Sequence, residues 1–174
     1  MTTPDGKFPN CVQIESGRGY HKALFNNGEV YAWGYSGNGE GGWGNNSNRN
    51  RALRCTNTNQ VDWLSIPVTK SFNESKIVKI ASSGGNDDSN AHHTLALTED
   101  GRVYSWGYNG YGQLGLGPNT TDGTNNNNRT SSQNRPQMIP TKYFYHPETK
   151  EEVKIIDVFC HGQEYGISYF RDEY

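Results

Sequence analysis

The amino-acid sequence predicts an all-β protein built from repeated units. One observation is a stretch rich in glycine and aromatic residues that occurs twice, at residues 28–44 and 101–117, with most of its glycines and aromatic residues aligned at one offset. The other is that no segment shows the apolar periodicity of a helix. Internal repetition over several tens of residues is typical of solenoids, propellers and arrays.

The repeated stretch itself reads as a strand followed by a turn. Its Val-Tyr-x-Trp run is rich in β-formers, and the Gly-x-Gly spacing that follows disfavours a helix and permits positive φ in tight turns. The Trp side chain is large enough to fill a layer between neighbouring units. Trp33 and Trp106 are therefore predicted to be core residues, together with Leu95 and Leu97 in the strand before the second stretch.

Further strands are predicted on both sides of these stretches. In chain order the predicted strands are 12–17, 20–25, 29–34, 61–68, 77–82, 93–98, 102–107, 137–145, 153–160 and 165–170. Segments 45–60 and 118–135 are dominated by Asn, Ser, Thr and Arg, and both are expected to be polar surface loops. For 118–135 two interpretations stay open, a flexible loop and an ordered binding loop.

Residues 77–117 contain two motifs in a fixed order. The first is Val-x-Ile-Ala, and the second is His-Thr-Leu-Ala-Leu-Thr-x-Asp-Gly-x-Val-Tyr-x-Trp-Gly-x-Asn-x-x-Gly-Gln-Leu-Gly-x-Gly. This order resembles the regulator of chromosome condensation repeat. Residues 12–44 resemble it with departures: Tyr20 or His21 stands for the His, and Glu40 opens a Glu-Gly-Gly-Trp-Gly run in place of Gln-Leu-Gly-x-Gly. Residues 155–174 hold a third, weaker start. The resemblance implies one repeat region over residues 1–174, folded as four-stranded antiparallel blades of a β-propeller, about 2.5–3 blades in this chain.

A partial propeller of this kind does not close into a ring. The chain is therefore expected to be a piece of a longer protein, an arc completed by partner subunits, or an arc capped by its own loops. An open blade face would expose an apolar layer of a kind that soluble monomers rarely tolerate. We predict that the chain does not act as an isolated closed monomer.

Composition and charge argue against several classes of function. The formal net charge is −2 and no basic run occurs, so nucleic-acid binding is not predicted. No apolar run approaches membrane-spanning length and the first residues lack the pattern of a signal peptide, so membrane insertion is not predicted and the compartment stays open between cytoplasmic and virion-associated. Cys11, Cys55 and Cys160 are expected to be free thiols, because their spacing fits no metal knuckle.

Motifs of catalysis and cofactor binding are absent from the sequence. No Gly-x-Ser-x-Gly or phosphate-cradling Gly-x-x-x-x-Gly-Lys occurs, so neither an enzyme nor a cofactor is predicted. Segment 84–93 combines Asp87 and Asp88 with two histidines. These residue types could bind a cation, but the spacing fits no EF-hand and favours a solvated polar turn. No metal is therefore predicted, and the two aspartates remain candidate binding residues.

Aromatic residues on the glycine turns are the other binding candidates. Tyr35, Tyr108 and Tyr111 follow the Trp of their repeat. Exposed aromatics on turns can stack on sugars or anchor a protein partner, and the alternative is packing between blades.

Three functions fit these observations. The first is a non-enzymatic interaction or scaffold module that binds a protein partner or neighbouring subunits. The second is a receptor- or glycan-binding structural protein of a virion or cell surface. The third, implied by the resemblance, is a guanine-nucleotide exchange factor for a small GTPase, although no segment matches the wedge that such relatives insert. The plant ultraviolet-B photoreceptor shares the implied fold, but its Gly-Trp-Arg-His-Thr repeats are absent here.

Overall fold

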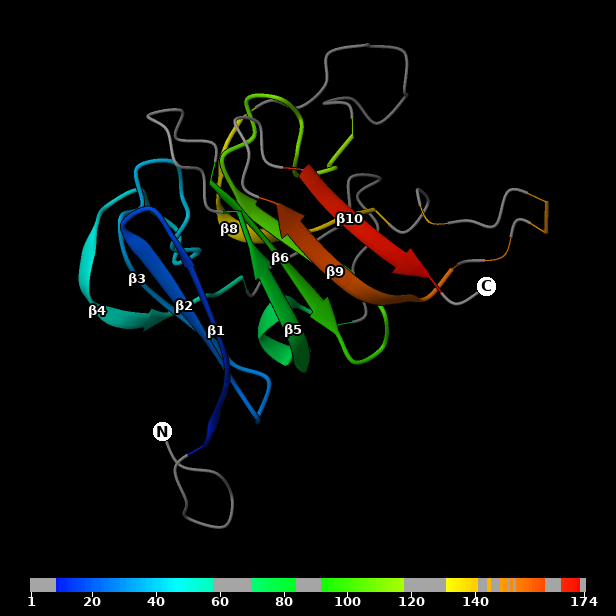
Figure 1. The fold of residues 1–174 in the computed structure, drawn as a ribbon, viewed down its shortest axis with the longest axis horizontal. Coiled ribbons are helices and arrows are strands. Elements are labelled where there is room, and N and C mark those ends of the chain that lie inside the picture. The colour runs from blue at the N-terminus through cyan, green and yellow to red at the C-terminus, as the bar shows by residue number, and fades with distance from the viewer. Residues whose placement is uncertain are drawn as a thin grey trace.

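Three antiparallel sheets form the described part of the chain (Figure 1). Blade 1 has the strand order β1-β2-β3-β4, with bounds Cys11–Gly17, Tyr20–Phe25, Val30–Gly34 and Arg49–Arg54. Blade 2 has the order β5-β6-β7-β8, with bounds Ile77–Ser82, His93–Thr98, Val103–Gly107 and Gln133–Met138. A hairpin of β9 (Ile155–His161) and β10 (Ile167–Asp172) follows. The computed structural model describes residues 9–57, 70–83, 92–117, 131–140, 144, 148–149, 151, 153–161 and 167–172.

The two blades repeat one register. Tyr20 pairs with Gly34 in blade 1, and His93 pairs with Gly107 in blade 2. Tyr20, and not His21, therefore occupies the position of the repeat's His. This equivalence lets any residue of blade 1 be compared with its counterpart in blade 2.

The first three strands of each blade are confirmed. The strands predicted at 12–17, 20–25, 29–34, 77–82, 93–98 and 102–107 agree with β1, β2, β3, β5, β6 and β7 to within a residue at either end. The last pair, predicted at 153–160 and 165–170, lies about two residues further along as β9 and β10.

The outer strands were predicted wrongly. Segment 45–60 was expected to be a loop but contains β4, and the expected loop 118–135 ends inside β8, which runs from 133 to 138 and not over 137–145. The predicted strand 61–68 and residues 118–130 lie outside the described residues. Both β4 and β8 are edge strands with mostly half-buried or exposed side chains, so they need few apolar residues.

A short 3₁₀ helix, η1 (Phe72–Glu74), leads into β5. The Glu74 carboxylate accepts hydrogen bonds from the backbone N–H (2.9 Å) and the hydroxyl (2.8 Å) of Ser71. These bonds hold the pKa of Glu74 below its usual value. Three residues are too few for apolar periodicity, but the Ser-x-x-Glu spacing is the signal that could have predicted this turn.

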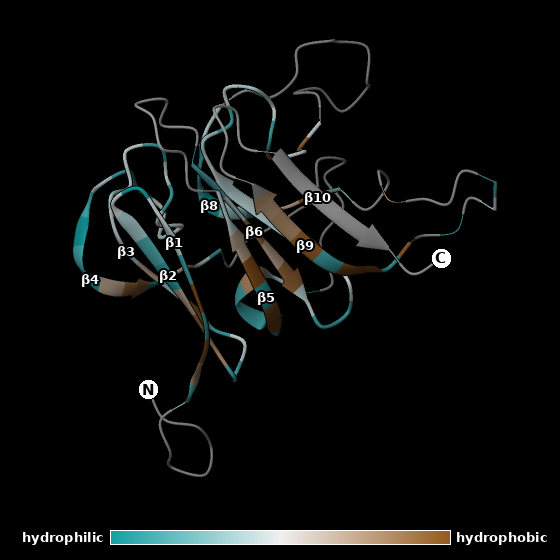
Figure 2. Ribbon diagram, viewed as in Figure 1, coloured by the Kyte–Doolittle hydropathy of each residue, from teal (hydrophilic) through white to brown (hydrophobic). Residues whose placement is uncertain are grey.

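The core lies between the blades. Trp106 is fully buried against blade 1, and Leu95 and Leu97 are buried on the other face of blade 2, against β9. The Trp106 indole N–H donates to the carbonyl of Glu40 at 3.0 Å, and the Phe72 ring meets its edge at a centroid distance of 5.7 Å. Figure 2 shows hydrophobic residues along β5 and β9, with hydrophilic residues on the first half of β4.

Trp33 is only half-buried, so its expected place in the core is wrong. Its ring stacks on His21 at a centroid distance of 5.4 Å. It also borders an apolar groove on the outer face of blade 1, whose empty volume of about 810 Å³ is partly open to solvent. The groove is lined by Pro9, Cys11, Ala23, Phe25, Tyr31, Trp33 and Ala52. Blade 1 covers the equivalent face of blade 2, whereas no described residue covers this face of blade 1.

Because of this open apolar groove, we expect the 174-residue chain to associate with further copies of itself. Covering apolar surface stabilises a contact by roughly 25 cal/mol per Å², less the entropy lost on association. Sedimentation at micromolar concentration should therefore show a species heavier than one chain, and Trp33→Glu should return it to the mass of one chain. A compact species of one chain that binds no apolar dye would contradict this expectation.

Candidate functional site

Two glycine turns lie at the same end of the sheets, each directly after the third strand of its blade: turn 1 (residues 35–44) and turn 2 (residues 108–117). The first residue of each turn is anchored to the residue that precedes the second strand of its blade. The backbone N–H of Tyr35 donates to the carbonyl of Gly19 (2.7 Å), and that of Tyr108 donates to the carbonyl of His92 (2.8 Å). The two turns therefore leave their blades in the same way.

Tyr35 and Tyr108 are half-buried because each ring folds back over its own turn. A Cβ atom added to Gly37 would lie 2.1 Å from the Tyr35 hydroxyl oxygen, and one added to Gly110 would lie 2.1 Å from that of Tyr108. A side chain at either glycine would displace the tyrosine ring, so glycine at these positions allows the ring to fold over the turn. The two rings therefore stabilise their turns and leave little surface for a partner to contact.

Tyr111 is the tyrosine that turn 2 presents to solvent, with 60% of its surface exposed. Its ring meets Tyr108 edge-on at a centroid distance of 5.9 Å. Its backbone N–H donates to the Gln113 side chain at 3.0 Å. In turn 1 the N–H of Asn38 donates to Glu40 in the same way at 2.8 Å, so Asn38 is the counterpart of Tyr111.

The acidic segment gives no site that can be described. Asp87 and Asp88 lie outside the described residues. His92 and His93, which follow them, are both buried, and burial lowers the pKa of His92. Among the residues that the structure describes, no group of His, Cys, Asp and Glu could hold a metal ion.

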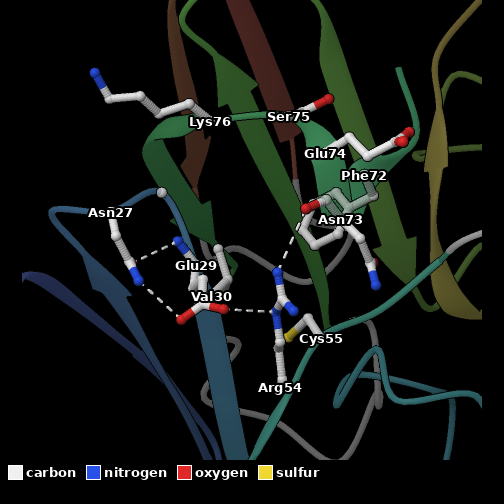
Figure 3. A pocket seen from close by; sticks show the side chains of 11 residues that line it. Asn27, Glu29, Val30, Arg54, Cys55, Phe72, Asn73, Glu74, Ser75 and Lys76 are labelled. Atoms are coloured by element: carbon white, nitrogen blue, oxygen red, sulfur yellow. Dashed lines mark hydrogen bonds and ion pairs between the residues drawn. The ribbon is translucent and has the colours of Figure 1, made fainter. Parts of the chain in front are cut away.

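A polar cleft that the sequence did not predict lies at the opposite end of the blades, where the turn between β2 and β3 meets the linker carrying η1 (Figure 3). Its empty volume is about 430 Å³, part of it open to solvent. It is lined by Asn27, Gly28, Glu29, Val30, Arg54, Cys55, Phe72, Asn73, Glu74, Ser75 and Lys76.

The polar walls of this cleft already bond to one another. Arg54 forms an ion pair with Glu29 (3.2 Å) and donates to the carbonyl of Asn73 (3.4 Å), and the Asn27 amide donates to Glu29 (2.9 Å). A ligand here would have to replace these contacts. We therefore interpret the cleft as a structural junction that holds blade 1 to the linker. Turn 2 is the more accessible of the two candidate binding surfaces.

The described residues include no helix long and apolar enough to cross a membrane.

Comparison with known sequences identifies the repeat. Residues 88–113 match the family model described as "Regulator of chromosome condensation (RCC1) repeat". The chain is 32% identical over 131 residues to RCC1 domain-containing protein RUG3, mitochondrial, of Arabidopsis thaliana, covering 75% of this chain and 21% of that protein. It is 33% identical over 108 residues to the Ultraviolet-B receptor UVR8 of the same plant, covering 62% and 20%. The chain thus spans about a fifth of these relatives.

Solved structures show the same arrangement of strands. Human WBSCR16 superposes with a TM-score of 0.58 at 19% identity, covering 90% of this chain and 30% of that one. Prp20p from Saccharomyces cerevisiae superposes with a TM-score of 0.56 at 20% identity, covering 100% and 33%. The repeat motif, its register and these neighbours agree. The chain belongs to the RCC1-like repeat family, and its sheets are blades of a β-propeller.

Proposed function

We propose that this chain is a non-enzymatic protein-binding module that presents turn 2 to a protein partner. The observation that carries the proposal is Tyr111, an aromatic side chain with 60% of its surface exposed on a turn of fixed shape. Tyrosine is enriched among the residues that contribute most to protein–protein binding. A single exposed tyrosine on a defined backbone is a suitable anchor for a partner's pocket.

The hydrogen bonds of turn 2 support this role by keeping its backbone ordered. The Asn109 side chain accepts the N–H of Leu114 at 2.9 Å, and the Ser105 hydroxyl donates to the Leu114 carbonyl at 2.7 Å. Leu114 itself is fully buried. A surface that is ordered before binding loses less conformational entropy in the complex.

Structural neighbours also bind proteins. The study of Prp20p reports binding properties to Gsp1p and histones, and yeast RCC1 has been solved bound to Kap60. These neighbours favour a protein partner over the glycan or virion alternative, which gains no support from them. The exchange-factor alternative is retained as an outcome of the experiment below.

Tyr111→Asn is expected to weaken partner binding at least about tenfold, because it removes the aromatic anchor. Turn 1 already carries Asn38 at the equivalent position, so the variant should keep the shape of the turn. Binding to Gsp1p, histones and Kap60 would be measured by fluorescence anisotropy.

Two controls accompany this measurement. Tyr111→Phe keeps the ring and should bind within about threefold of the unchanged chain. Ile14→Asn removes a side chain that is 62% exposed on β1, away from turn 2, and should bind normally. Failure of all three probes to bind, or unchanged binding by Tyr111→Asn, would contradict the proposal. Faster release of labelled GDP from Gsp1p would favour the exchange factor, and hits on a sugar array without protein binding would favour the glycan alternative.

A further inference from the structure

Lys22 is fully buried in the junction between blade 1 and blade 2. In the shared register it is the counterpart of Leu95, since Lys22 pairs with Ala32 and Leu95 pairs with Ser105. Leu95 packs in the apolar cluster that faces β9. Blade 1 therefore places an amine where blade 2 has an aliphatic side chain.

The amine of Lys22 has no hydrogen-bond partner among the described residues. Its nitrogen lies 3.9 Å from the centroid of the Tyr20 ring and 5.8 Å from that of Trp106. Aromatic faces attract a cation, but they do not replace the hydrogen bonds that water gives an ammonium group. The charged form is therefore poorly solvated as long as the two blades stay in contact.

Titratable groups near Lys22 lie on several surrounding segments: Glu15 on β1, Tyr20 on β2, Glu40 on turn 1, Cys55 after β4, His92 before β6 and Cys160 on β9. The Glu40 carboxylate accepts from the backbone N–H and the side chain of Asn38 (2.8 and 3.2 Å), and it makes no ion pair with Lys22. Burial lowers the pKa of Lys22 to about 8, and the acidic neighbours only partly oppose this effect.

We propose that protonation of Lys22 loosens the contact between blades 1 and 2, which makes this junction a proton-sensitive joint of the propeller. The neutral amine packs between the rings of Tyr20 and Trp106 without needing a partner. The ammonium form regains hydrogen bonds only in water, which it reaches when blade 1 separates from Trp106. This inference stands independently of the binding role of turn 2.

The pKa of Lys22 differs between the closed and the open junction, and this difference sets the direction in which pH shifts the equilibrium. With the junction closed, Lys22 has a pKa of about 8, against 10.5 when exposed. Below pH 8 Lys22 is protonated in both states, and the closed junction is then least stable relative to the open one. As the pH rises from about 8 to about 10.5, only the open state holds the proton, so the closed state is increasingly favoured.

Cys55 is a built-in reporter of this opening. Its thiol is fully buried in the same junction and donates to the carbonyl of Gly41 at 3.2 Å. The alkylation rate of Cys55, divided by the rate in the denatured chain at the same pH, gives the opening constant. From pH 7 to pH 9.5 the opening constant should fall roughly 10–30-fold more in the unchanged chain than in Lys22→Met.

Burial raises the pKa of Cys55 in the closed junction. Alkylation takes place in the open state, where the thiol is exposed in every variant, so the rates can be compared between variants. Lys22→Leu, which copies the residue of blade 2, is a second variant and should behave like Lys22→Met. Lys154→Met removes an exposed lysine that does not line the polar cleft and should keep the full pH response. Equal pH responses in the unchanged chain and both Lys22 variants would overturn the proposal.

Discussion

Trp106→Ala is expected to lower the free energy of unfolding by about 3–5 kcal/mol. The indole is fully buried, and a Cβ atom on Gly42 would lie only 2.8 Å from its Nε1 atom, so the backbone of turn 1 packs directly on the ring. The truncation would leave a cavity between the blades. It would also leave the carbonyl of Glu40 without its 3.0 Å donor. Chemical denaturation with an unchanged m-value would measure the loss.

Trp33→Ala is the matched control, because Trp33 has the same position in blade 1. Its half-buried ring borders the open apolar groove and rests mainly on His21. Its truncation should cost about 1–2 kcal/mol. Equal losses for the two variants, or a loss below about 1 kcal/mol for Trp106→Ala, would contradict the assignment of the junction as the core.

The inner strands were predictable because the repeat motif itself lies on them. Strands β2, β3, β6 and β7 carry the apolar alternation and the Trp, and each has neighbouring strands on both sides. The edge strand β4 reads Arg-Asn-Arg-Ala-Leu-Arg, which resembles a polar loop by composition. Its strand conformation comes from pairing with β3, an interaction between segments that composition does not reveal.

The site was predictable only in part for a related reason. The sequence placed three tyrosines on glycine turns, but it did not reveal that Tyr35 and Tyr108 fold over Gly37 and Gly110 while Tyr111 stays exposed. That difference depends on contacts within each turn.

Lys22 was missed although a signal was available, since aligning the two repeats by their strand pairs places it opposite Leu95. A charged residue at a core position of a repeat indicates a junction of unusual chemistry. The polar cleft had a weaker signal, the capping spacing from Ser71 to Glu74.

Gly107→Ala is expected to lower the free energy of unfolding by about 3–5 kcal/mol. Gly107 ends β7 with φ of 103°, and an added Cβ atom would lie 2.5 Å from the carbonyl oxygen of His92 and 3.0 Å from the Cα atom of His93. Both are backbone atoms. The His92 carbonyl also accepts the N–H of Tyr108 at 2.8 Å, so relieving the clash would break the anchor of turn 2.

Gly112→Ala separates this clash from the cost of backbone conformation. Gly112 also has a positive φ, 77°, but an added Cβ atom would meet nothing within 4 Å. Alanine there should cost only the penalty of the left-handed conformation, about 1–2 kcal/mol. Thermal or urea denaturation of the two variants should therefore differ by at least about 2 kcal/mol. If the two losses were equal, the close approach of β6 to the end of β7 would not contribute to stability, and the shared glycines after the Trp strand would serve backbone conformation alone.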